Sequence, residues 1–373
     1  MDKKAYLARL ADAPDYQADK ARLASPPPEA VIDRVAPEVI LAKRRRYAKV
    51  IEETGSTDLN VIWAEIDRQF YADTDPVLLK PLLEHYRSAY YASQPAAELV
   101  DASHPAYALV ANSLKAYNAT FPDRSLAMPR YVAVSQQIGT AYLPYSDMLV
   151  VQTRLLEELP EEAPVIMFHE LGHKAQAEYD GDVSIRYERL RHIAEQVPDL
   201  GKRCDLGLSI PEFHLAFPEH SYDWIETRPY VPAWLKEVFK GYGKSLDRAM
   251  QPERAASLDA KIANAPACQD ALRQIADTKP EVMQRLKEYG MVKIRQKERD
   301  ADIVALQVAG DPAVAEAWDA LFTPQMRKIA KTSSDHPTFQ ERIQLTGCDL
   351  SDSEGVTCPS LPRMMSENQI ARR

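Results

Sequence analysis

Two histidines four residues apart, His169 and His173, lie inside an apolar segment of the chain. The spacing of apolar residues predicts a helix over about 161–179. Positions four apart share a helix face, so both imidazoles can reach one ion while Glu170 projects beside it. The segment His169–His173 reads HELGH and matches the HExxH pattern, which favours a metal site. The alternative is a helix whose histidines only satisfy hydrogen bonds in the core.

A catalytic zinc site uses three protein ligands and keeps one open position, so a third ligand must come from elsewhere in the chain. Glu298 and Asp302 lie four residues apart in a predicted helix over about 280–309 and share a face. One carboxylate can bind the metal while the other orients a histidine that binds it. Taken alone, such a charged pair is more commonly part of a solvated helix face.

Together, these two segments resemble the zinc peptidase family that includes the CAAX prenyl proteases and the bacterial HtpX-type proteases. That family places a strand pair before its HELGH helix, a Glu-x-x-Ala-Asp motif on a later helix, and a His-Pro segment followed by an arginine. The resemblance covers residues 130–180 and 290–345. The matching features, in order, are strands at 140–143 and 148–151, HELGH, Glu298 with Ala301 and Asp302, and His336-Pro337 with Arg342.

The resemblance implies one Zn²⁺ per chain, bound by His169, His173 and Glu298, with Asp302 supporting a histidine. It also implies that Glu170 is the general base that takes a proton from the water at the open position of the metal.

The resemblance further makes His336 the candidate donor to the oxyanion, with a helix-capping or core histidine as the alternative. Arg342 is expected to order the His-Pro segment through a carboxylate. Gly172 would let another backbone segment pass close to the metal helix.

The strand at about 139–143 is expected to form the rim of the cleft and to hold an extended substrate through Thr140, Ala141 and Tyr142. Pro144 lacks a backbone donor and is compatible with the edge of a sheet. An ordinary core strand is the alternative. The family usually has an asparagine where this chain has Thr140, and many members span membranes, so the natural substrate is not carried over.

The expected activity is that of a zinc metalloendopeptidase, which hydrolyses internal peptide bonds of a protein or peptide substrate. A catalytically silent, zinc-stabilised binding or chaperone-like module is the main alternative. The intact Glu170 argues against it, because a scaffold needs only the metal ligands. A zinc hydrolase acting on a non-peptide substrate is a third interpretation.

The predicted fold is mainly α (α+β), a zincin-like domain with a small sheet next to the HExxH helix. With 12 glycines and 27 prolines, the chain favours helices separated by rigid joints. The predicted units are a helical N-terminal region (1–104), a gluzincin-type domain (105–345) with a helical insertion at 182–280 as a candidate lid, and an irregular tail (346–373). Helices are predicted within 1–25, near 38–54, 59–71, 77–92, 105–118 and 152–159, and after Gly310. The only predicted sheet uses strands at about 130–134, 140–143 and 147–151.

The net charge of −9 gives no general attraction to phosphate backbones, so nucleic acid is not an expected partner. The basic run Lys43–Arg46 is interpreted as a solvated helix face. The sequence contains neither an apolar run of the ~20 residues that cross a bilayer nor a signal-peptide core. The expected location is therefore cytoplasmic, or periplasmic or secreted if a signal peptide has been removed. The sequence gives no indication of the oligomeric state.

None of the cysteines forms a CxxC pair, so a four-cysteine zinc site has little support. Cys348 and Cys358 bracket a polar loop that a disulfide could close. Two free thiols are the alternative, and a Cys204–Cys268 bridge is also left open.

Overall fold

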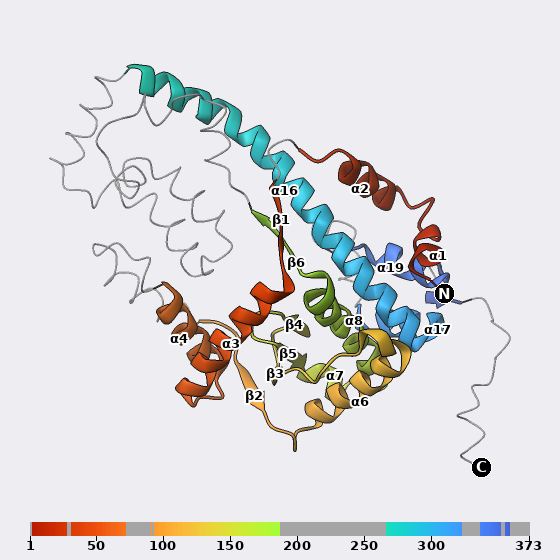
Figure 1. Cartoon of the computed structure of the whole chain (residues 1–373). Coiled ribbons are helices and arrows are strands. Elements are labelled where there is room, and N and C mark those ends of the chain that lie inside the picture. Colours follow the sequence, from red (N-terminus) through yellow and green to blue (C-terminus); the bar gives the residue numbers. More distant parts are fainter. Residues whose placement is uncertain are drawn as a thin grey trace, which may run out of the picture.

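The computed structural model describes residues 2–27, 31–71, 91, 93–186, 266–322, 336–351 and 355–358. Over these ranges the chain is mainly helical and contains a small mixed sheet (Figure 1). The longer helices are α1 (Lys3–Ala8), α2 (Pro14–Ala24), α3 (Pro37–Thr54), α4 (Leu59–Tyr71), α6 (Pro105–Thr120), α7 (Thr153–Glu157), α8 (Ala163–Ala175), α16 (Pro266–Ala309), α17 (Asp311–Leu321) and α19 (Phe339–Thr346). The predicted helices at these places are confirmed, whereas the one at 77–92 lies outside the described residues.

The central sheet has the strand order β2-β3-β5-β4, with β3 and β5 parallel and the other pairs antiparallel. Its strands are β2 (Ala97–Val100), β3 (Tyr131–Ser135), β4 (Ala141–Leu143) and β5 (Met148–Gln152). The three predicted strands are confirmed, and β4 lies at an edge as expected. Strand β2 was not predicted, and it joins residues assigned to the N-terminal region to this sheet.

The expectation of a single sheet is wrong. A second, antiparallel pair joins β1 (Val31–Val35) to β6 (Asp182–Arg186). A third joins β7 (Asp349–Ser351) to β8 (Gly355–Thr357), so the tail is not irregular over these residues. The disulfide Cys348–Cys358 closes this hairpin, with 10 residues of sequence separation. Of the other two cysteines, Cys204 lies outside the described residues and the side chain of Cys268 is not described.

Helix α8 lies at the centre of the molecule, where it packs against α6, α16, α17 and strand β4. Nearly all of its side chains are buried, including Met167 and Leu171, and this burial fixes the orientation of the helix about its axis. Helix α16 crosses over α8 and extends well beyond it (Figure 1). Because α16 begins at Pro266, the predicted start near 280 is wrong. The remainder of the predicted insertion, residues 187–265, lies outside the described residues.

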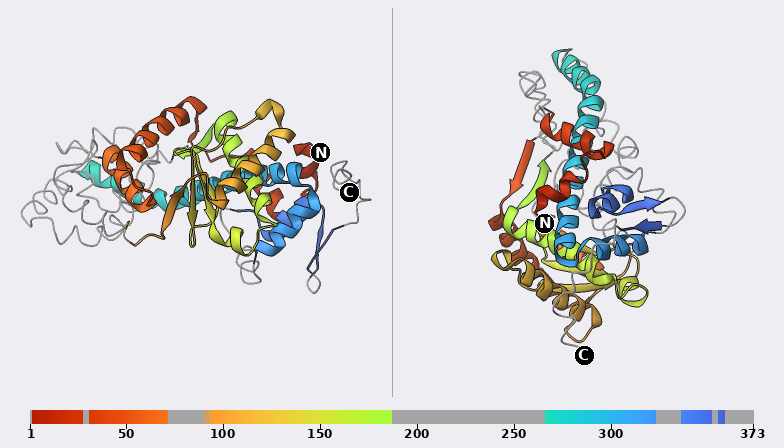
Figure 2. Two further views of the ribbon diagram at one scale, coloured as in Figure 1. Left: turned by 90° about the horizontal axis from the view of Figure 1, so that it is seen from below. Right: turned by 90° about the vertical axis from the view of Figure 1, so that its right-hand side faces the viewer.

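The N-terminal helices α1 and α2 pack along α16, as Figure 2 shows from two further sides. Asp19 on α2 is buried and accepts hydrogen bonds from Arg295 and Arg299 of α16. Burial raises the pKa of this carboxyl, but the two guanidinium groups outweigh that effect and leave the pKa below its usual value. The N-terminal residues are therefore joined to the helix that also contains Glu298.

None of the helices among the described residues is both long enough and apolar enough to cross a membrane.

Candidate metal centre

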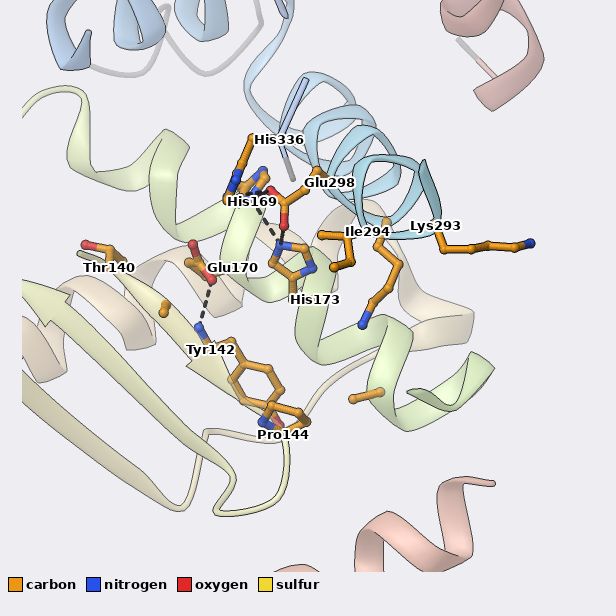
Figure 3. Close-up of a pocket in the computed structure, with 13 residues that line it drawn as sticks. Thr140, Tyr142, Pro144, His169, Glu170, His173, Lys293, Ile294, Glu298 and His336 are labelled. Carbon is orange, nitrogen blue, oxygen red and sulfur yellow. Dashed lines mark hydrogen bonds and ion pairs between the residues drawn. The ribbon is translucent and has the colours of Figure 1, made fainter. Parts of the chain in front are cut away.

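The candidate metal centre consists of two imidazoles on α8 and one carboxylate on α16 (Figure 3). His169 Nε2 and His173 Nε2 lie 3.2 Å apart. Glu298 Oε2 lies 3.3 Å from His169 Nε2, and Glu298 Oε1 lies 3.3 Å from His173 Nε2. The three side chains each direct one ligand atom to a common point, so they could hold a metal ion. The structure thus brings together the three residues predicted as ligands.

Close contact between the two helices makes this convergence possible. A Cβ atom at Gly172 would stand 2.9 Å from Cα of Ala301, a separation that real Cβ atoms essentially never show. Only glycine therefore fits at this crossing. The sequence-based expectation that Gly172 allows a backbone to pass close to the metal helix is confirmed.

Each histidine is oriented through its second ring nitrogen. His169 Nδ1 lies 2.8 Å from Asp302 Oδ1, one helical turn beyond Glu298. His173 Nδ1 lies 3.2 Å from Gln176 Oε1, and Gln176 Nε2 donates to the carbonyl of Lys297 at 2.9 Å. Both Nε2 atoms are thereby left facing the common point. Gln176 was not predicted, although its position three residues after His173 on the same helical run is a signal that could have identified it.

Arg342 holds the two carboxylates of α16 in place from α19. Its Nη2 donates to Glu298 Oε2 at 3.2 Å, and its Nε forms an ion pair with Asp302 Oδ2 at 3.3 Å. Its guanidinium also lies 4.1 Å from the ring centroid of Trp318, whose ring meets the His169 imidazole edge to face. Arg342 therefore contacts two carboxylates of α16. Its expected role in ordering the His-Pro segment stays a prediction. Trp318 was not predicted, because its contact with the site depends on how α17 packs.

In the metal-free site, the neighbouring carboxylates favour the protonated, positively charged form of His169. Burial alone would lower the pKa of His169, but the hydrogen bonds and charges of Asp302 and Glu298 raise it to about 10. Burial would raise the pKa of Glu298, but its contacts with His169 and His173 hold that pKa far below its usual range. Without a metal, the site is thus an imidazolium paired with carboxylates.

Glu170 lies beside the metal-binding point and faces strand β4. Its Oε2 accepts a hydrogen bond of 2.8 Å from the backbone N–H of Tyr142. Burial raises the pKa of this carboxyl above its ordinary value, and the neighbouring His169 and His173 act in the opposite direction.

A cavity of about 300 Å³ opens between β4 and α16 and contains the metal-binding point (Figure 3). The predicted substrate residues Thr140, Ala141 and Tyr142 line it, together with Glu170 and His336. Sequence reasoning did not identify three lining residues from α16, which are Lys293, Ile294 and Lys297. His336 Nε2 lies 3.6 Å from Glu298 Oε2, and its side chain is 53% exposed.

Comparison of the chain with protein-family models, with curated proteins and with solved structures finds no match. The geometry of this site is therefore the basis on which a function can be argued.

Proposed function

We propose that this protein is a zinc metalloendopeptidase of the gluzincin type that hydrolyses internal peptide bonds. The observation that carries the proposal is the position of Glu298. This carboxylate, which lies far along the chain from HELGH, is within 3.3 Å of both histidine nitrogens. Asp302, which lies on α16 with Glu298, forms a hydrogen bond with Nδ1 of His169. A carboxylate in this position is typical of zinc sites.

The donor set supports zinc as the metal. Two imidazole nitrogens and one carboxylate oxygen form a known set of ligands for catalytic zinc. With ligand bonds of about 2.0–2.1 Å in a tetrahedron, neighbouring ligand atoms lie about 3.3 Å apart. The two histidine nitrogens lie 3.2 Å apart, and each oxygen of Glu298 lies 3.3 Å from one of them. With one ligand atom taken from each residue, the three atoms lie within 4.8 Å of one another, close enough to share one zinc ion.

The proposed reaction divides between the metal and the chain. A bound zinc ion would act as a Lewis acid towards the scissile carbonyl and would acidify water. Glu170 takes a proton from water and passes it to the leaving amine, as a buried carboxylate with a raised pKa can do. Strand β4, which lies at the edge of the described sheet and lines the cavity, holds the extended substrate by backbone pairing. His336, which is exposed at the cavity, donates a hydrogen bond to the oxygen on which negative charge develops.

This division of roles resembles that of the family of the CAAX prenyl proteases and HtpX-type proteases. The mainly helical fold with a small sheet next to α8 is compatible with a zincin-like domain. A silent zinc scaffold is less well supported, because Glu170 lies in the cavity without being one of the three grouped ligands.

Removal and restoration of the metal tests the proposal. Chelation of the purified protein should abolish cleavage of an unstructured protein such as casein, and one equivalent of Zn²⁺ should restore it. Cleavage that survives complete removal of the metal, verified by elemental analysis, would contradict the proposal.

We also propose that the protein works in an oxidising compartment, periplasmic or extracellular, rather than in the cytoplasm. The reason is the disulfide Cys348–Cys358, since such bonds persist mainly in oxidising environments. Alkylation of free thiols in intact cells, before lysis, should leave Cys348 and Cys358 unmodified. Alkylation of both would support the cytoplasm instead.

A further inference from the structure

Behind strand β4, five side chains from five elements form a closed cycle of hydrogen bonds, here called the Arg44 network. Its members are Arg44 of α3, Tyr142 of β4, Asp147 of the following turn, Lys174 of α8, and Glu178 of the π-helical turn η3 (Gln176–Asp180). Arg44 donates to Glu178 and to the Tyr142 hydroxyl, and that hydroxyl donates to Asp147 at 2.8 Å. Lys174 Nζ donates to Asp147 and to Glu178, each at 2.6 Å, and closes the cycle.

The Arg44 network is unusual because so much charge is buried. Lys174 is 0% exposed and Arg44 9% exposed, so the interpretation of Arg44 as part of a solvated helix face is wrong. Two cations and two carboxylates balance one another within it. Desolvation of such groups offsets most of their attraction, so a buried ion network adds little net stability. What it does provide is a fixed position for every group that it contains.

The groups that the network fixes belong to helix α8 and strand β4, which form two sides of the candidate site. Lys174 directly follows His173 on α8. Arg44 Nε donates to the carbonyl of Pro144 at 2.8 Å, at the end of β4. The side chain of Tyr142 is held by the network while its backbone N–H donates to Glu170 at 2.8 Å. Tyr142 thus connects the network to the carboxylate of Glu170 by a direct hydrogen bond.

We propose that the Arg44 network positions Glu170 through Tyr142 and so sets the geometry in which the base meets water and substrate. The inference rests on the proposed peptidase activity. Arg44 and Tyr142 are positioning residues, because their side chains act on Glu170 through the Tyr142 backbone N–H and do not touch the reacting atoms. Small displacements matter here, since a reacting group moved by about 1 Å can lower a rate by about 100-fold.

Tyr142→Phe tests the proposal because it removes the hydroxyl and keeps the backbone N–H that reaches Glu170. Arg44→Met removes the cation from α3. Lys49→Met is the matched control on the same helix, because Lys49 pairs with Glu53 at the surface and its side chain is 75% exposed. All three are compared with wild type for zinc content, thermal unfolding, peptide hydrolysis and amide hydrogen exchange.

In Tyr142→Phe and Arg44→Met, zinc content should be unchanged and kcat should fall about tenfold, with KM within about twofold of wild type. The amide of residue 142 should exchange about tenfold faster, while that of Leu149 in the central strand β5 stays protected. Lys49→Met should change neither kcat nor the exchange rate of the residue 142 amide. In a Glu170→Gln background, the two substitutions should produce no further loss of activity, because the group on which they act is gone.

Unchanged kcat together with unchanged exchange at residue 142 would overturn the proposal. An equal loss of activity in the Glu170→Gln background would also overturn it, since the network would then only maintain the fold. If Arg44→Met does not fold, Tyr142→Phe decides the question. Zinc-loaded wild type that cleaves nothing would refute the proposed function itself, and the exchange measurement would then still decide whether the network holds the Tyr142 amide on Glu170.

Discussion

Gly172 of α8 and Ala301 of α16 meet backbone to backbone, and a Cβ atom at Gly172 would also lie 3.2 Å from Cβ of Ala301 and 3.3 Å from its carbonyl oxygen. The contact sets the separation of the two helices. Since the histidines lie on one helix and Glu298 on the other, it also sets the distances between the ligand atoms.

Gly172→Ala is therefore expected to weaken both the fold and the metal site. Alanine favours a helix over glycine by about 1 kcal/mol, but overpacking at a helix crossing typically costs about 1–3 kcal/mol. The net result should be a lower melting temperature and weaker zinc binding, measured by calorimetry and metal titration. Gly139→Ala is the control, because a Cβ there meets nothing within 4 Å. Equal stability and zinc affinity in Gly172→Ala and wild type would show that the helices can separate without penalty.

The grouping of His169, His173 and Glu298 was accessible from sequence because each motif lies within one or two turns of a helix. Local spacing decides which face such residues share, and the resemblance to a peptidase family supplied the pairing of the two helices. Strand β4 was recognisable from its short β-rich run and from Pro144, which is compatible with an edge.

Other features depend on contacts that a single sequence does not reveal. Strands β1 and β6 pair over a separation of about 150 residues, so neither carries a local signal for its partner. The helix predicted from about 280 begins earlier, at Pro266, and passes through Pro280. Arg44 lies in a basic run whose other members are at least partly exposed. The burial of Arg44 itself follows from the packing of α3 beside η3.

Zinc binding should release a proton, because the pKa of His169 in the metal-free site is raised to about 10. The imidazolium present at neutral pH must lose its proton before Nε2 can bind a metal, whereas Glu298, whose pKa is lowered, is already ionised. The apparent zinc affinity should therefore increase about tenfold per pH unit between about pH 6 and 8.

Calorimetric titration in buffers of different ionisation enthalpy measures this proton release directly. Asp302→Asn provides the comparison, because it removes the carboxylate that bonds His169 Nδ1. On binding zinc, the variant should release a smaller fraction of a proton than wild type does. Its affinity for zinc should be about 10–100-fold weaker. Zinc affinity that does not change with pH, with no proton released, would contradict the described electrostatics of the site.

Glu170→Gln tests the central claim most directly, because glutamine keeps the size of the side chain and removes its basicity. The measurement is zinc content together with the rate of cleavage of an unstructured protein, for wild type and variant side by side. Wild type and Glu170→Gln should each hold one zinc per chain, while the variant cleaves about 10²–10⁴-fold more slowly. Cleavage by the variant near the wild-type rate would show that Glu170 is not the base, and zinc-loaded wild type that cleaves nothing would show that the site is not a peptidase.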